Sequence, residues 1–211
     1  MLQQPFGVFA SAVISFPKLL VAAVNGPAVG VGVTLLPHCD IVYAYGGRAG
    51  APPAGTEDSR RWHARAGGGQ PADFWTPFFR LAIVPEFCSS VTFPEILGWS
   101  LANEMLIMGR KLSAQEALAA GLISTLVTAE TEGDFLRQVQ DDLRRTVVGA
   151  TMAAESALTF KHIMMRNRRP TLVRVFNEEL VDLDRRMKAG HPKEALKNLK
   201  GLPRRIGGSR L

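Results

Sequence analysis

The stretch Ser15–Ala44, SFPKLLVAAVNGPAVGVGVTLLPHCDIVYA, decides the fold of this chain. Within it, Leu19–Val24 is a continuous apolar run, which is typical of a strand buried on both faces. Asn25–Pro27 ends that run, because Asn and Gly tolerate positive φ and Pro cannot extend a β-ladder. We expect a glycine-rich turn to follow, then a short helix over Val33–Pro37 and a second strand over Ile41–Tyr43.

The turn after the first strand contains Gly30 and Gly32, which carry no side chain that would keep a ligand away from the backbone. The first N–H groups of the following helix have no acceptor within the helix and point back toward the turn. Backbone donors of this kind are suited to holding an oxyanion. Glycines between a strand and a helix also occur in tight connections that bind nothing, so the pattern alone leaves both interpretations open.

Composition indicates one globular domain with a real core, at 211 residues, 46% hydrophobic and 21% charged. No apolar run is long enough to cross a bilayer, so we expect no membrane span. The net charge of +6 is concentrated between Arg185 and Arg205 without aromatic residues to stack on bases, which argues against nucleic acid. A solvated helix face or an anionic ligand such as CoA explains that charge. Cys39 and Cys88 are isolated, as expected of small buried hydrophobes.

Strands alternate with helices in the first part of the chain and helices follow, which predicts an α/β fold with a helical C-terminal region. Leu81–Pro85 is a strand-like run, and Ser89-Ser90 is a candidate cap for the helix that follows, with Pro94 in its first turn. The other helices are expected over 8–14, 100–108, 114–120 with a Ser113/Glu116 capping box, 134–143, 152–165, 171–183 and 193–199.

Composition changes abruptly over Tyr45–Asp73, which is rich in Gly, Pro, Ala and Arg and has no periodicity. A structureless loop of this length is unusual inside a compact domain, so we interpret residues 45–73 as a disordered insertion. The predicted organisation is a core over 1–132 that contains this insertion, a helical lid or oligomerisation region over 133–206, and a targeting tail over 207–211.

Five strings, in this order, resemble the enoyl-CoA hydratase/isomerase (crotonase) family: VNGPAVGVGVTLLPHCDIVYA, FWTPF, IVPEFCSS, ANEMLIMGRKLSAQEA and GLIS. They are most similar to the peroxisomal Δ3,Δ2-enoyl-CoA isomerases and to the CoA-binding domain of the chromodomain Y-like proteins. The resemblance implies a crotonase-like spiral ββα core and trimeric association. It also implies a preceding segment with one oxyanion-hole N–H. Since no such motif occurs before Phe16, the chain is expected to be truncated at its N-terminus.

Glu86 is the candidate base, because it directly follows an apolar run that should raise its pKa toward neutrality. A solvent-facing glutamate at a helix N-terminus is the alternative. The resemblance assigns Glu86 to the catalytic glutamate of the isomerases. It also places Thr34 and Phe78 where hydratases carry their two glutamates, which favours a double-bond shift over water addition.

The resemblance further implies the rest of the site. The Val31 N–H is one half of the oxyanion hole, and the substrate contacts are Ala28, Gly30, Phe74, Trp75, Pro77 and Phe78. No metal or nucleotide cofactor is expected, since CoA enters as part of the acyl-CoA thioester substrate.

The function predicted is therefore an enoyl-CoA Δ3,Δ2-isomerase of fatty-acid β-oxidation that acts as a homotrimer. Ser209, Arg210 and Leu211 are a conservative variant of the Ser-Lys-Leu address, which predicts a peroxisomal import receptor as partner and the peroxisome, or a related organelle such as a glycosome, as location. Two alternatives are a non-catalytic acyl-CoA-binding module of the chromodomain Y-like type and an inactive truncated fragment.

Overall fold

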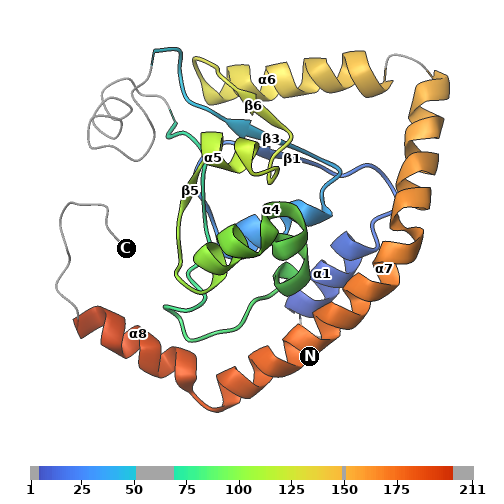
Figure 1. Cartoon of the computed structure of the whole chain (residues 1–211). Coiled ribbons are helices and arrows are strands. Elements are labelled where there is room, and N and C mark those ends of the chain that lie inside the picture. Colours follow the sequence, from blue (N-terminus) through green and yellow to red (C-terminus); the bar gives the residue numbers. More distant parts are fainter. Residues whose placement is uncertain (1–4, 51–68, 149–150, 202–211) are drawn as a thin grey trace.

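The computed structural model describes residues 5–50, 69–148 and 151–201 (Figure 1). Its larger parallel sheet has the strand order β1-β3-β6, with β1 Val21–Val24, β3 Ile41–Tyr45 and β6 Thr125–Val127. A second sheet has the order β2-β4-β5, with β2 Ala28–Val29, β4 Asp73–Trp75 and β5 Leu112–Ser113. In this second sheet β2 and β4 run parallel, and β5 is antiparallel to β4.

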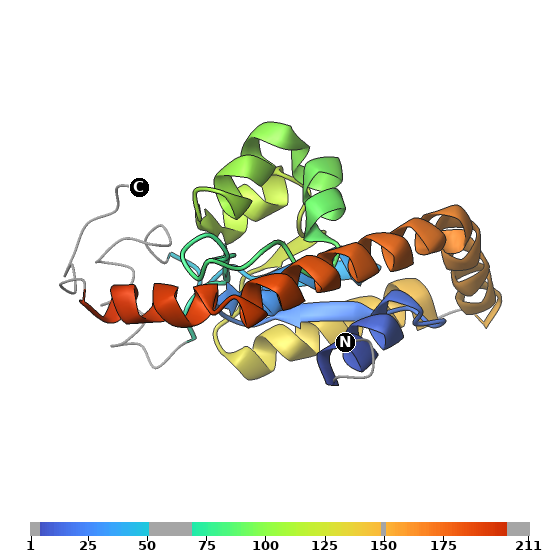
Figure 2. The same ribbon diagram turned by 90° about the horizontal axis from the view of Figure 1, so that it is seen from below.

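Helices cover both sides of the larger sheet, as Figure 2 shows: α4 and α5 lie on one side of the strands and α6 lies on the other. The described helices are α1 Pro5–Ile14, α2 Val31–Thr34, η1 Leu36–His38, α4 Ser89–Leu106, α5 Ala114–Ala119, α6 Glu132–Leu143, η2 Arg144–Val148, α7 Thr151–Lys188 and α8 His191–Gly201. The predicted α/β fold with a helical C-terminal region is confirmed.

Alternate residues of β3 pack into two different cores, because successive side chains of a strand point to opposite faces. Val42 and Ala44 belong to the cluster shared with α4 and α5. Tyr43 and Tyr45 face α6, where they pack with residues such as Phe135. The strand is therefore buried on both faces, whereas the residues of β1 at the edge of the described sheet are only half-buried.

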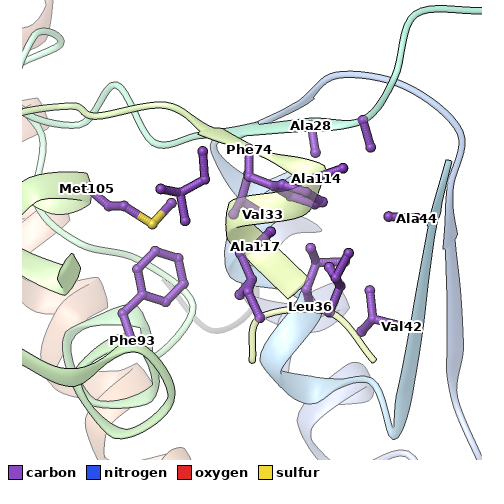
Figure 3. Close-up of a cluster of buried hydrophobic side chains, with 14 of the residues drawn as sticks. Ala28, Val33, Leu36, Val42, Ala44, Phe74, Phe93, Met105, Ala114 and Ala117 are labelled. Carbon is purple, nitrogen blue, oxygen red and sulfur yellow. The ribbon is translucent and has the colours of Figure 1, made fainter. Parts of the chain in front are cut away.

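The main core joins the two sheets. Phe74 from β4, Val33 from α2 and Ala114 from α5 meet there, with Phe93 and Met105 of α4 to one side of them (Figure 3). All five are fully buried.

Local signals predicted the start of α5 correctly and the start of α6 to within two residues. At α5 the predicted capping box is present, with the Glu116 N–H donating to Ser113 Oγ at 3.2 Å and the Ser113 N–H donating to Glu116 Oε2 at 2.8 Å. Gly121 follows α5 with φ +80°, a conformation that side chains rarely adopt. At α6 the Asp134 N–H donates to Thr131 Oγ1 at 3.1 Å, so α6 begins at Glu132, slightly earlier than expected.

Three other expectations were wrong. Residues 152–165 and 171–183 are not separate helices, because α7 runs continuously through Pro170 and changes direction about midway along its length (Figure 1). Leu81–Pro85 forms no strand: its first two residues belong to a turn, and the other three have no regular secondary structure. Pro94 lies in the second turn of α4 rather than the first. The non-helical Gly98, with φ +74° and ψ 159°, separates the two parts of α4 that correspond to the helix predicted after Ser89-Ser90 and the helix predicted over 100–108.

Proline is tolerated within α7 because it removes only one N–H donor, and packing holds the two halves of the helix in place.

Of the predicted insertion, residues 51–68 lie outside the described part, while Tyr45 ends β3 and Asp73 begins β4. The predicted tail over 207–211 also lies outside it. In the part of the chain that is described, no helix is both long and apolar enough to cross a membrane.

Candidate active site

Glu86 lies in the loop between β4 and α4, in a tight turn closed by the main chain. The Ser89 N–H donates to the Glu86 carbonyl oxygen at 3.1 Å, and the Glu86 N–H donates to Ser89 Oγ at 3.1 Å. The Glu86 side chain is half-buried rather than solvent-facing. It also precedes α4, which begins at Ser89, so the alternative of an exposed first-turn glutamate does not describe this position.

The two residues after Glu86 have left-handed backbone conformations, with φ +56° at Phe87 and +63° at Cys88. This conformation costs about 1–2 kcal/mol for a residue with a Cβ, so it persists only where its surroundings enforce it. Here both side chains are fully buried, in a cluster with α1 and α7 that includes Ile14 and Phe176.

His38 of η1 ties the glycine-rich region to the Glu86 turn. Its ring stacks on the Phe87 ring with a centroid separation of 4.7 Å, and its Nε2–H donates to the Phe87 carbonyl oxygen at 2.9 Å. Burial lowers the pKa of His38, so the ring is neutral. Because the proton sits on Nε2, Nδ1 is an acceptor, and it has no hydrogen-bond partner among the described residues.

The electrostatic surroundings of Glu86 favour its protonated form. Burial, and secondly the negative charge of Glu179, raise the pKa of Glu86 from its ordinary value of 4.5 to about 7. A general base works best when its pKa lies near the operating pH. Glu86 therefore takes up and releases a proton in the neutral range, as the sequence predicted from the apolar run before it.

The raised pKa of Glu86 has a consequence for stability. The folded protein binds this proton more tightly than the unfolded chain, so stability falls as pH rises from 4.5 to about 7. Glu86→Gln is expected to raise the free energy of unfolding at about pH 8 by roughly 1–3 kcal/mol, and by almost nothing at about pH 4.5. Urea unfolding at both pH values measures this difference.

Glu104→Gln is a matched control, because Glu104 lies on α4 in a surface ion pair with Arg110. It should show no such pH-dependent gain. A gain for Glu86→Gln that is equal at both pH values would contradict the raised pKa.

The glycine-rich turn leaves the first N–H groups of α2 free of intrahelical acceptors. Gly30 adopts φ +57° and ψ −120°, and its N–H donates to the Trp75 carbonyl oxygen at 2.8 Å. The next donor along the chain is the Val31 N–H, at the first position of α2. Val33 and Thr34 already donate to the Gly30 carbonyl oxygen, at 2.8 and 3.1 Å.

The two candidate segments leave the sheet at the same edge. The strands β2 and β4 are parallel neighbours, with Ala28 opposite Phe74 and Val29 opposite Trp75. Gly30 and Val31 continue from the end of β2, and the loop that carries Glu86 continues from the end of β4. Carboxyl ends of neighbouring parallel strands are where open α/β sheets bind ligands.

The predicted substrate contacts fall into two groups. Ala28, Phe74, Pro77 and Phe78 are buried, and Phe74 is a central core residue. Trp75 is half-buried, and its Nε1–H donates to the Gly109 carbonyl oxygen at 2.9 Å. Arg80 Cζ and Lys111 Nζ each lie 5.7 Å from the centroid of the Trp75 ring. Of the two positions assigned to hydratase glutamates, Thr34 and Phe78, both are buried, and Thr34 Oγ1 has no partner among the described residues.

A cavity of about 260 Å³ opens beside the Glu86 loop. It is lined by Val84, Pro85, Ser90, Val175, Glu178, Glu179 and Asp182. Sequence reasoning missed the α7 side of this region, including Glu179. A signal was present: Glu179 falls seven residues after Leu172 and three after Phe176, on the apolar face of its helix.

Comparison with known proteins identifies the family of this chain. The family model for enoyl-CoA hydratase/isomerase matches residues 68–199. Enoyl-CoA delta isomerase 2 of Rattus norvegicus is 38% identical over 175 residues, 83% of this chain and 37% of that protein. Chromodomain Y-like protein 2 of Mus musculus is 44% identical over 116 residues, 55% of this chain and 18% of that protein. The chain thus spans well under two thirds of the length of these relatives.

Solved structures share the fold over nearly the whole chain. Pseudomonas aeruginosa OdaA matches with a TM-score of 0.76 and 31% identity, covering 96% of this chain and 70% of that one. An enoyl-CoA hydratase/isomerase from Pseudoalteromonas atlantica T6c matches with a TM-score of 0.75 and 26% identity, covering 96% and 71%. The fold is therefore crotonase-like, and the chain belongs to the enoyl-CoA hydratase/isomerase family.

Proposed function

We propose that this chain moves the double bond of a 3-enoyl-CoA to give trans-2-enoyl-CoA, with Glu86 as the base and then the acid. Glu86 removes a proton from C2, and the electron pair delocalises into the thioester to form a dienolate. The same carboxyl then returns the proton to C4, which leaves the double bond between C2 and C3. No proton is gained or lost overall, and CoA enters only as part of the substrate.

The observation that carries this proposal is the half-buried Glu86 carboxyl with a pKa of about 7. Adding water to a double bond requires a second carboxylate to position and activate the water. Thr34 and Phe78 hold the corresponding positions, and neither can ionise at neutral pH. A single carboxyl is sufficient for a proton shuttle between two carbons, which favours the isomerase over the hydratase.

The dienolate oxygen needs hydrogen-bond donors where its negative charge develops. The Val31 N–H is the donor proposed for this oxygen, at the start of α2 and beyond the end of β2. The proposal also includes trimeric association, a role in fatty-acid β-oxidation, and peroxisomal import through Ser209–Leu211, which lies outside the described residues.

A direct assay tests the proposal. The protein is incubated with a 3-enoyl-CoA, and the two enoyl-CoA isomers, which have equal mass, are separated by liquid chromatography and identified against standards. Any 3-hydroxyacyl-CoA is identified by its higher mass. We expect 2-enoyl-CoA to accumulate without 3-hydroxyacyl-CoA. Hydration of added trans-2-enoyl-CoA at a comparable rate would contradict the single-carboxyl mechanism.

A second candidate function is acyl-CoA binding without turnover. It is favoured by the 44% identity to mouse chromodomain Y-like protein 2. Calorimetric titration with a saturated acyl-CoA distinguishes the two candidates when it is combined with the assay above. Saturable binding together with no 2-enoyl-CoA would support the binding module.

A further inference from the structure

Glu179 is a buried carboxyl on the apolar face of α7. Its side chain is only 8% exposed, between neighbours such as Phe176 and Leu180 in the cluster that α7 forms with α1 and the Glu86 turn. Burying a carboxylate is costly unless hydrogen-bond donors surround it. The position of Glu179 therefore requires an explanation in terms of what it binds.

Three donors from the start of α4 converge on the Glu179 carboxylate. The Cys88 N–H donates to Oε2 at 2.6 Å, and the Ser90 N–H and Oγ–H donate to Oε1 at 3.0 and 2.5 Å. The first N–H groups of a helix need external acceptors, and the cap residue Cys88 supplies no side-chain cap of its own. A carboxylate from a distant helix takes that role, with the sign of charge that a helix N-terminus favours.

These contacts hold the segment that carries Glu86. Phe87 and Cys88 both have left-handed φ values and directly follow Glu86, so the hydrogen bond to the Cys88 N–H keeps a strained turn in place. We infer that Glu179 is a positioning residue for Glu86, because its carboxylate holds the turn that fixes where the Glu86 side chain lies. This inference rests on the proposed function, in which Glu86 is the base.

The charge of Glu179 acts on Glu86 in addition to its hydrogen bonds, since it is the charged neighbour that raises the pKa of Glu86. Burial raises the pKa of Glu179 itself, while the three donors oppose that rise. No other side chain around the turn supplies a comparable negative charge in the described part of the chain. His38 is neutral, and burial raises the pKa of the Cys88 thiol to about 12.

The remaining charged groups near the turn are paired elsewhere. Arg168 is bound to Glu95, and the cavity-lining Glu178 and Asp182 form ion pairs with arginines of α7. The residues of α1 at this contact, Phe6 and Phe9, are apolar. Among these groups, Glu179 is therefore the one whose charge raises the pKa of Glu86.

Glu179→Gln removes the charge and replaces one acceptor oxygen by an amide donor. We expect the midpoint of Glu86 titration to fall by roughly half a pH unit, since a like charge is lost. We also expect kcat with 3-enoyl-CoA to fall about 10-fold at high pH with KM nearly unchanged, since the base is misplaced. The midpoint is measured by ¹³C NMR of the glutamate carboxyls without substrate, with Glu86→Gln used for assignment.

Glu178→Gln is the matched control. Glu178 is the preceding residue on α7, but it is exposed and pairs with Arg174 at 2.8 Å. Its removal should leave the Glu86 midpoint and kcat unchanged. Glu179→Asp retains the charge on a shorter side chain. In this variant the midpoint of Glu86 titration should lie nearer to the wild-type value than in Glu179→Gln, while kcat stays low.

The outcomes separate this inference from the proposed function. An unchanged Glu86 midpoint in Glu179→Gln overturns the inference, whether or not the wild-type protein turns over 3-enoyl-CoA. A wild-type protein without turnover counts against the proposed function alone, because the carboxyl titration needs no substrate. If Glu179→Gln does not fold, Ser90→Ala removes one donated bond, and an unaltered kcat in that folded variant overturns the inference.

Discussion

Glu86→Gln is expected to slow conversion of 3-enoyl-CoA to 2-enoyl-CoA by about 10³-fold, within the range of general acid–base contributions. Gln has the shape of Glu but cannot accept and return a proton at neutral pH. The loss should appear in kcat, since the carboxyl acts on the reacting proton rather than on substrate binding. Steady-state rates with 3-enoyl-CoA at several pH values measure it.

The pH profile sharpens this test. Wild-type kcat/KM should rise with pH through about 7, where Glu86 loses its proton. The residual rate of Glu86→Gln should lack that rise. Glu104→Gln serves again as the control and should retain the wild-type profile. Equal rates for Glu86→Gln and wild type would eliminate Glu86 as the base.

Val31→Pro is expected to lower the same turnover by about 10²-fold, because it deletes one oxyanion-hole donor without changing the helix. Val31 is the first residue of α2, a position where proline is favoured because its missing N–H has no intrahelical acceptor. Proline also restricts the residue before it, but Gly30 has no Cβ to clash with the ring. Turnover of 3-enoyl-CoA and far-UV circular dichroism are measured together.

Val31→Ala is the paired control, since it shortens the same exposed side chain and retains the N–H. It should keep wild-type turnover. If Val31→Pro and Val31→Ala are equally active and both folded, the Val31 N–H is not a donor to the reacting thioester.

Sequence reasoning succeeded where the deciding partners are close together in the chain. The Ser113/Glu116 box at the start of α5 depends on neighbours within one helical turn, and it is present. The strand predicted over Ile41–Tyr43 is present as β3, because a short apolar run is a local signal. The prediction that Leu19–Val24 is buried on both faces was wrong, because β1 lies at the edge of the described sheet and is only half-buried.

Local patterns failed where tertiary contacts outweigh them. Two separate helices were predicted over 152–165 and 171–183, yet α7 continues through Pro170, because its apolar face packs against α1 and the Glu86 turn through Leu172 and Phe176. Leu81–Pro85 has the composition of a strand but finds no strand partner in the described sheets. This segment instead leads into the turn in which Phe87 and Cys88 have positive φ values.

The sequence by itself determined the family, the α/β order of elements and Glu86 as the candidate base, because these depend on motifs and on short-range periodicity. Only the tertiary structure decided how Glu86 is held and what charge it faces. Glu179 lies 91 residues beyond Cys88, and nothing local to either residue specifies that they meet. A pKa depends on burial and on charges nearby in space, so it is defined only once α7 packs over the turn.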